Sequence, residues 1–264
     1  MSITRPKTRP IAQRAAAMAG ALGDGVSRRI DLMRSQPPEN AARPSNWLFF
    51  RELSSLGEPI ARQFRKPLDL GTSATPRVVI LLPGFGTHPL RMRYMARTLE
   101  AAGHRVKRWG MGFNLGPTEE NFEILSRRVC DVRQRYGQKV VLVGWSLGGI
   151  FAREIAKRHP DCVAKVVTMG SPFSHTPYSN NVWRLYQLIT GQSVERPPIK
   201  ADLAAKPPVE TVALWSPRDG MVSVRSACGC QGERDRAIAL RCSHIGFSNS
   251  PEAIRAIAAE LDAA

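Results

Sequence analysis

Three side chains that lie far apart in the sequence could together carry out acyl transfer. Ser146 stands in the pentapeptide G-W-S-L-G, and Asp219 and His244 each follow a later hydrophobic segment. A serine hydroxyl is a poor nucleophile unless a histidine accepts its proton and a carboxylate orients that histidine. We therefore expect Ser146 to act as the nucleophile, His244 as the general base and Asp219 as the orienting acid.

The segment around Ser146 has the pattern of a sharp turn between a strand and a helix. An aliphatic run precedes it, and a helical pattern, Leu147–Arg158, follows it. Glycines on both sides leave room for the strand and the helix, and the free N–H groups at the start of the helix can stabilise negative charge. We expect an oxyanion hole formed by the amides of Leu147 and of Phe85, which lies in a Pro-Gly-Phe-Gly turn. That turn could instead need its glycines only for geometry.

Asp219 and His244 are preferred to other acids and histidines because of their positions. Each follows an expected strand, at the edge of a parallel sheet where Ser146 must also lie. Most of the other histidines and acids precede strands, end helices or lie in an insertion. His88 also follows a strand and could approach the site, and Asp219 could merely cap the turn at Gly220.

The elements that must position these residues follow an alternating strand–helix pattern. Thr118 is placed to cap a helix that Gly137 would end. This alternation predicts an α/β fold, with a mainly parallel sheet and helices on both of its faces. The strands are expected at residues 78–82, 104–109, 140–143, 163–167, 209–215 and 237–242. We expect one domain over residues 77–264, with a lid inserted at about 174–208.

Residues before 77 do not follow this strand–helix alternation. We expect an N-terminal arm over residues 1–45 and a helical segment over 46–76. Apolar residues at 47–50, 53 and 56 fit one broad helical face. That helix could pack on the main domain or, with arginines close by, serve as an amphipathic membrane-surface anchor. The basic and then Ala-rich start resembles a signal peptide only superficially, so export is not expected.

Composition excludes several classes of protein. The 264 residues are 43% hydrophobic and 23% charged, which is typical of a globular chain, and no apolar run is long enough to span a membrane. The net charge of +16 favours encounters with anionic partners, such as a membrane surface or an acidic protein. No nucleic-acid-binding motif accompanies that charge, so no nucleic-acid partner is expected.

Five cysteines, an odd number in a chain of this length, favour a reducing compartment. We expect a cytoplasmic protein, with peripheral membrane attachment as the alternative. Cys228, Cys230, Cys242 and His244 could be taken for metal ligands, but their spacing is unlike common zinc sites, so no metal is expected. A bridge from Cys242 to Cys228 or Cys230 is the other alternative.

Over about residues 77–264 the chain resembles the α/β-hydrolase superfamily. The resemblance rests on four motifs: Leu82-Pro83-Gly84-Phe85, Gly144 to Gly149, Asp219 to Val222, and Ser243 to Gly246. The elbow is similar to that of esterases acting on pimeloyl-carrier-protein methyl esters, whose carrier is acidic. Segments 108–116 and 169–173 look more like lipase-type bacterial hydrolases. Members commonly have His-Gly at the oxyanion turn, where this chain has Pro83-Gly84.

The resemblance implies hydrolysis of carboxylic esters of lipophilic or acyl substrates through an acyl-enzyme, with no cofactor. We expect Trp145, Trp183 and Tyr186 to bind the substrate, the last two from an apolar lid wall at 181–192. The substrate would be a small ester or an acyl group on an acidic carrier protein. Two alternatives remain. The same residues could serve a thioesterase or acyltransferase, or the chain could be a non-catalytic basic α/β scaffold that binds an anionic membrane or partner.

Overall fold

A single parallel sheet forms the centre of the molecule. The computed structural model describes residues 25–54, 65–196, 199 and 201–263. All neighbouring strands are parallel, in the order β2-β1-β3-β4-β5-β6. The strands are β1 (Val78–Leu82), β2 (Arg105–Arg108), β3 (Val140–Trp145), β4 (Val163–Met169), β5 (Glu210–Trp215) and β6 (Arg236–Ala239). The predicted α/β class is confirmed.

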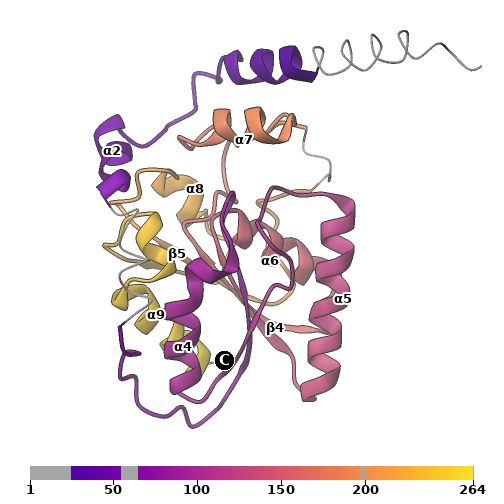
Figure 1. The fold of residues 1–264 in the computed structure, drawn as a ribbon, viewed down its shortest axis with the longest axis vertical. Helices are drawn as coiled ribbons and strands as arrows, with labels where there is room; N and C mark the ends of the chain where they lie inside the picture. The colour runs from indigo at the N-terminus through magenta and orange to yellow at the C-terminus, as the bar shows by residue number, and fades with distance from the viewer. Residues whose placement is uncertain (1–24, 55–64, 197–198, 200, 264) are drawn as a thin grey trace, which may run out of the picture.

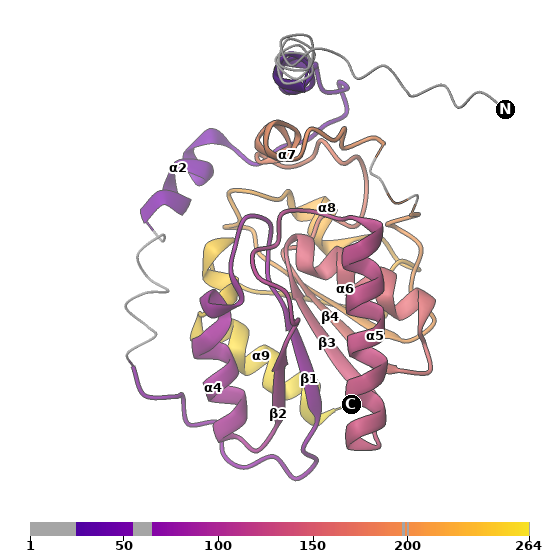
Figure 2. The same ribbon diagram turned by 45° about the vertical axis from the view of Figure 1, so that its right-hand side comes forward.

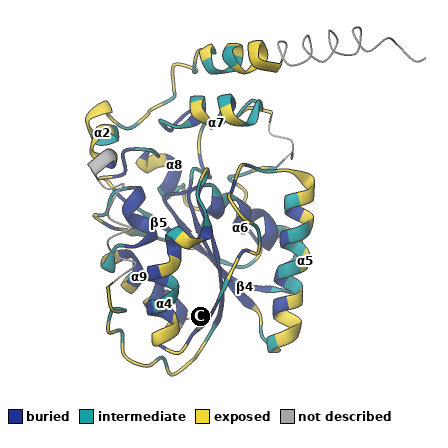
Figure 3. Ribbon diagram, viewed as in Figure 1, coloured by how far each residue is buried: buried dark blue, intermediate teal, exposed yellow. Residues whose placement is uncertain are grey.

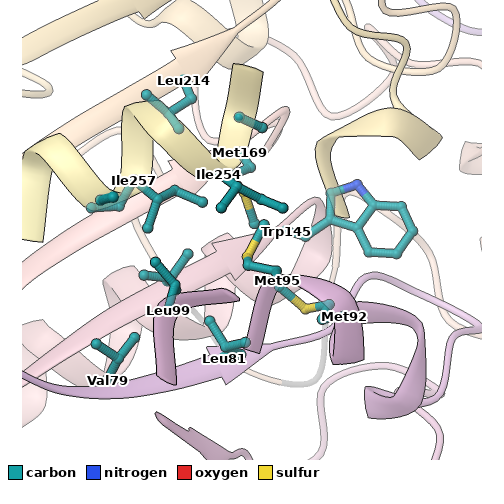
Figure 4. Close-up of a cluster of buried hydrophobic side chains, with 14 of the residues drawn as sticks. Val79, Leu81, Met92, Met95, Leu99, Trp145, Met169, Leu214, Ile254 and Ile257 are labelled. Carbon is teal, nitrogen blue, oxygen red and sulfur yellow. The ribbon is translucent and has the colours of Figure 1, made fainter. Parts of the chain in front are cut away.

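Helices cover both faces of this sheet (Figure 2). They are α4 (Arg93–Ala101) and α9 (Pro251–Asp262) on one face, and α5 (Glu119–Tyr136) and α6 (Leu147–Arg158) on the other. Val79 and Leu81 of β1 point into the α4/α9 layer, drawn in Figure 4, whereas Val78 and Ile80 point into the α5/α6 layer. Because β1 is buried on both faces, its sequence is an unbroken aliphatic run.

The helix ends follow local sequence signals. The Thr118 hydroxyl accepts the Asn121 N–H at 3.1 Å at the start of α5, and Gly137 ends that helix with a φ of 66°. Ser250 caps α9 through the N–H of Ala253. Strand β6 ends at Ala239, earlier than predicted, although the Leu240 N–H still donates to the Trp215 carbonyl of β5 at 2.8 Å.

Above the carboxyl ends of the strands lies a layer built from the predicted lid and the N-terminal segments (Figure 1). It contains α7 (Trp183–Thr190), α2 (Asn46–Ser54) and helical turns over residues 25–34. The short helix α8 (Val224–Cys228), which follows β5, lies beneath them. Arg29 donates to the Ile189 carbonyl at 3.1 Å, and Arg184 donates to the Met33 carbonyl at 3.2 Å. The described part of the arm is therefore bonded to the lid helix. Short 3₁₀ helices, η1 (Pro89–Met92) and η2 (Ile245–Ser248), follow β1 and β6.

Helix α2 forms as predicted, but its orientation differs from the expected apolar face. Much of α2 is coloured as exposed in Figure 3. Trp47 and Phe50 are each 65% exposed, while Glu52 is 1% exposed. Leu48 and Phe49 are half-buried, and the side chains of residues 53 and 56 lie outside the described set. Within the described residues, no helix is long and apolar enough to cross a membrane.

The cysteines pair differently from the predicted alternatives. Cys130 on α5 and Cys162 before β4 form a disulfide across 32 residues of sequence. Cys228, Cys230 and Cys242 are free thiols, so neither bridge considered for Cys242 is present. The odd cysteine count pointed to a reducing compartment, and it gave no indication that two cysteines far apart in sequence meet beside the sheet.

Candidate active site

Ser146 lies at a strained turn between β3 and α6. Its backbone has φ 54° and ψ −122°, in a region that residues with side chains seldom adopt. A Cβ on Gly144 would lie 2.4 Å from the Gly148 carbonyl oxygen, and one on Gly148 would lie 2.3 Å from the Leu82 carbonyl oxygen. Both glycines are therefore required by the close approach of strand and helix, as the sequence pattern predicts.

Asp219 and His244 meet in a buried pair. His244 Nδ1 lies 2.8 Å from Asp219 Oδ2, and both side chains are almost completely shielded from solvent. The other carboxylate oxygen, Oδ1, accepts the N–H groups of Met221 and Val222, each at 2.8 Å. Asp219 thus caps its own turn and also bonds the imidazole, so the turn cap and the histidine partner are one and the same residue.

The surroundings of His244 change its proton affinity. Burial by itself lowers the pKa of the imidazole, but the charge and hydrogen bond of Asp219, with a smaller contribution from the charge of Glu52, outweigh it. The net effect raises the pKa of His244 above its ordinary value of 6.5. The site therefore favours the imidazolium that forms when His244 takes up a proton.

Ser146 and the Asp219–His244 pair flank the end of β4. The Ser146 N–H donates to the Met169 carbonyl at 2.8 Å. The next residue, Gly170, lies against the pair, because a Cβ there would be 2.9 Å from Asp219 Oδ2 and 3.1 Å from His244 Nδ1. No hydrogen bond joins the Ser146 hydroxyl to His244 in the described structure. Catalytic contacts of this kind are often loose in the absence of substrate.

The predicted oxyanion turn lies against the serine. A Cβ on Gly84 would be 3.3 Å from Ser146 Cβ. Among the described residues, the amides of Phe85 and Leu147 have no hydrogen-bond acceptor, so both donors are free. Asn114 holds this turn in place. Its side-chain amide donates to the Pro83 carbonyl at 2.8 Å, and its backbone carbonyl accepts the Gly86 N–H at 2.7 Å.

A mainly apolar cavity of about 130 Å³ opens beside Ser146. The lid contributes Trp183 and Tyr186 to its wall, and the Phe85 and Tyr186 rings lie 5.2 Å apart. Burial raises the pKa of Tyr186 to about 12, so its phenol stays neutral there. Other residues that line the cavity are Leu147, Ile150, Val194, Ile199, Leu203 and Val222.

The position of Trp145 does not match the prediction that this residue binds substrate. Its indole is 3% exposed and packs in the α4/α9 layer (Figure 4), and it is not among the residues that line the described cavity. The indole N–H donates to the His244 carbonyl at 3.0 Å. Trp145 therefore supports the loop that carries the histidine instead of contacting the cavity.

The free thiols do not gather around His244. Cys230 Sγ lies 3.9 Å from His175 Nε2, and burial raises the pKa of the Cys242 thiol to about 12. The described residues contain no group of three or more histidine, cysteine, aspartate or glutamate side chains arranged to hold a metal ion.

Comparison with known proteins agrees with this architecture. Residues 77–193 match a family model described as the alpha/beta hydrolase fold. A pyrethroid hydrolase structure, 20% identical, aligns over 72% of this chain and 98% of its own with a TM-score of 0.50. The chain has the α/β-hydrolase fold. A 2-hydroxy-6-oxo-6-phenylhexa-2,4-dienoate hydrolase from Rhodococcus sp. strain RHA1 also aligns, with 14% identity, 72% and 91% coverage and a TM-score of 0.50.

One curated relative is similar in sequence over a shorter stretch. The pimeloyl-[acyl-carrier protein] methyl ester esterase of Vibrio parahaemolyticus serotype O3:K6 (strain RIMD 2210633) is 33% identical over 95 residues. The match covers 35% of this chain and 36% of that esterase, so it spans about a third of the relative's length.

Two supporting residues were not singled out from the sequence. Gly170, with a φ of 54°, gives the Asp219–His244 pair its space, and Asn114 fixes the oxyanion turn. The motif Met169-Gly170-Ser171-Pro172-Phe173 was noticed for its resemblance to lipase-type hydrolases. A glycine directly after a strand expected beside the nucleophile is the signal that could have identified Gly170.

Proposed function

We propose that this chain is a serine hydrolase that cleaves carboxylic esters of lipophilic acyl substrates. The observation that carries the proposal is the buried Asp219–His244 pair next to the strand end against which the strained Ser146 lies. Strained backbone and buried, mutually oriented ionisable groups cluster at functional sites. A basic scaffold without catalysis would need neither the φ of 54° at Ser146 nor free amides beside it.

The mechanism would proceed through an acyl-enzyme. Ser146 Oγ attacks the ester carbonyl while His244 Nε2 takes its proton, and the amides of Phe85 and Leu147 bind the oxyanion. The imidazolium, stabilised by Asp219, then gives that proton to the departing alkoxide, and the acyl group stays on Ser146. Water attacks the acyl-enzyme in the second half, with His244 again as base, and releases the acid.

The cavity favours a lipophilic acyl group. Its lining is largely apolar, and Tyr186 is neutral within it. The similar curated protein is named for an ester on an acyl carrier protein, and the net charge of +16 suits an acidic carrier. An acyl ester, free or on such a carrier, is the substrate class that we propose.

The decisive experiment combines a fluorophosphonate probe with a panel of p-nitrophenyl esters and thioesters of graded chain length. We expect covalent labelling of Ser146 and preference for esters with an apolar acyl chain. Ser146→Ala should remove labelling and lower kcat by about 10⁵-fold or more. Ser126→Ala on α5 is the matched control and should behave as the wild type. Normal turnover by Ser146→Ala would reject the mechanism, and preference for thioesters would move the activity to thioester cleavage.

A further inference from the structure

Glu52 of helix α2 is a buried carboxylate that contacts the loops of the acid and of the base. Its side chain is 1% exposed. Oε1 accepts the Gly220 N–H at 2.9 Å and the His244 N–H at 2.7 Å, and Oε2 accepts the Ile245 N–H at 3.0 Å. Gly220 directly follows Asp219, so one side chain joins the two segments that present the Asp219–His244 pair.

The backbone of α2 packs against the loop that follows Asp219. A Cβ on Gly220 would lie 2.2 Å from the Leu48 carbonyl oxygen, so the helix sits directly on the acid loop. The lid and the arm also meet there, because the Asn181 amide donates to the carbonyls of Gly220 at 2.9 Å and Pro44 at 3.1 Å. The Glu52 bonds and the close approach of Leu48 therefore hold α2 on this loop, and Asn181 links the loop to the chain just before the helix.

The contacts of Glu52 are chemically specific. A carboxylate offers only acceptors, and here three backbone N–H donors converge on its two oxygens. Burying a carboxylate is costly unless such bonds compensate. An apolar residue at position 52 would leave the N–H groups of Gly220, His244 and Ile245 without this acceptor.

We propose that Glu52 is a positioning residue of the active site, which fixes the acid and base loops relative to each other and makes the N-terminal helix α2 part of the catalytic apparatus. The effect on catalysis rests on the proposed function, whereas the effect on His244 does not. The ionisable groups whose charges act on His244 are Asp219, from the loop after β5, and Glu52. The rings of Trp145 and Phe247 pack against the imidazole as uncharged neighbours.

The test is Glu52→Gln, which keeps the side chain's size but removes its charge and places an NH₂ group opposite a backbone donor. We expect kcat to fall about tenfold, with KM changed less than twofold. The pKa of the His244 imidazole, followed by NMR without substrate, should fall, and the acid limb of the pH–rate profile should move with it. Glu52→Asp keeps the charge and should leave the His244 pKa closer to that of the wild type.

Glu100→Gln is the matched control, because it makes the same change at an exposed site on α4. It should leave kcat and the His244 pKa unchanged. A folded Glu52→Gln variant with the wild-type kcat and imidazole pKa would overturn the proposal, as would an equal loss in Glu100→Gln. If the wild type hydrolyses no ester, the proposed function fails, and the NMR titration still decides the role of Glu52.

A second measurement covers the case in which Glu52→Gln does not fold. In the wild-type protein, the amide hydrogens of Gly220, His244 and Ile245 should exchange slowly with solvent, because Glu52 accepts all three. Fast exchange at these three amides, in a molecule whose β3 amides are protected, would show that the bonds do not persist and would reject the proposal.

Discussion

Two groups of ionisable side chains lie at opposite ends of the sheet, and they differ in whether every polar atom has a bonding partner. Near the amino ends of β4 and β5, the Lys165 ammonium lies 3.2 Å from carboxylate oxygens of both Glu210 and Glu260 and 2.8 Å from the Glu260 carbonyl. Arg236 bonds the same two carboxylates. In this cluster both cations meet both carboxylates, and no atom is directed at the cavity beside Ser146.

At the carboxyl ends, the Asp219–His244 pair is buried more completely than this cluster, in which Arg236 and Glu210 are partly exposed, but one atom of the pair has no partner. Asp219 has its partners, while Nε2 of His244 makes no hydrogen bond to any described residue. Complete pairing stabilises a fold. A buried ionisable pair with one free nitrogen, at the strand ends where a serine also lies, is instead typical of a catalytic site. Mutations at the two ends should therefore separate activity from stability.

Among the changes that compare the two ends of the sheet, Asp219→Asn should have the largest effect. The amide oxygen can still accept the N–H groups of Met221 and Val222, so the loop should fold, but the charge that stabilises the imidazolium and fixes its tautomer is lost. We expect kcat to fall by about 10⁴-fold with the melting temperature little changed, as measured by ester hydrolysis and thermal unfolding.

Asp202→Asn is the matched control for this change. Asp202 also accepts two backbone N–H groups in a turn, those of Ala204 and Ala205, but it is exposed and does not contact His244. It should retain full activity. A loss of activity in Asp219→Asn that merely follows unfolding would show that the carboxyl-end pair is structural, like the cluster at Lys165.

The opposite result is expected for Lys165→Met. Removing this fully buried ammonium leaves the Glu210 and Glu260 carboxylates with only Arg236, which should cost about 3–5 kcal/mol of unfolding free energy. Urea unfolding measures this loss, and kcat per folded molecule should not change. The partly exposed pair of Lys206 and Asp235, at 2.9 Å, provides the control, since Lys206→Met should cost less than about 1 kcal/mol. Equal costs at both lysines would contradict the comparison.

Local patterns made much of the site predictable from sequence. The Gly-x-Ser-x-Gly turn needs only the close approach of one strand and the next helix, so residues 144–148 carry the information themselves. The positions of Asp219 and His244 followed from the rule that parallel strands end at one edge of the sheet. The central strands of the sheet were predictable because strands buried on both faces have continuous aliphatic sequences.

Contacts between distant segments were not predictable in this way. Glu52 bonds backbone amides 168 to 193 residues away, and any residue type except proline could supply those donors. Apolar periodicity placed Trp47 and Phe50 on one broad apolar face, to pack on the domain or to meet a membrane surface. In the structure both are exposed, and α2 buries a carboxylate whose partners the pattern does not show. The Cys130–Cys162 pair likewise depends on how α5 lies beside β4.

The smallest expected effect is a displacement of the acid limb of the pH–rate profile, which is measured first on the wild-type protein. His244 must be neutral to accept the Ser146 proton, so kcat/KM should rise as pH increases through the pKa of the free enzyme. Because Asp219 raises that pKa, the midpoint should lie above the ordinary histidine value of 6.5. Lys165→Met should keep the wild-type midpoint, since Lys165 belongs to the cluster at the other end of the strands. A midpoint below 6.5, or one that moves with Lys165, would mean that the field at His244 is not set by its own carboxylate partner, and the distinction between the two buried groups would fail.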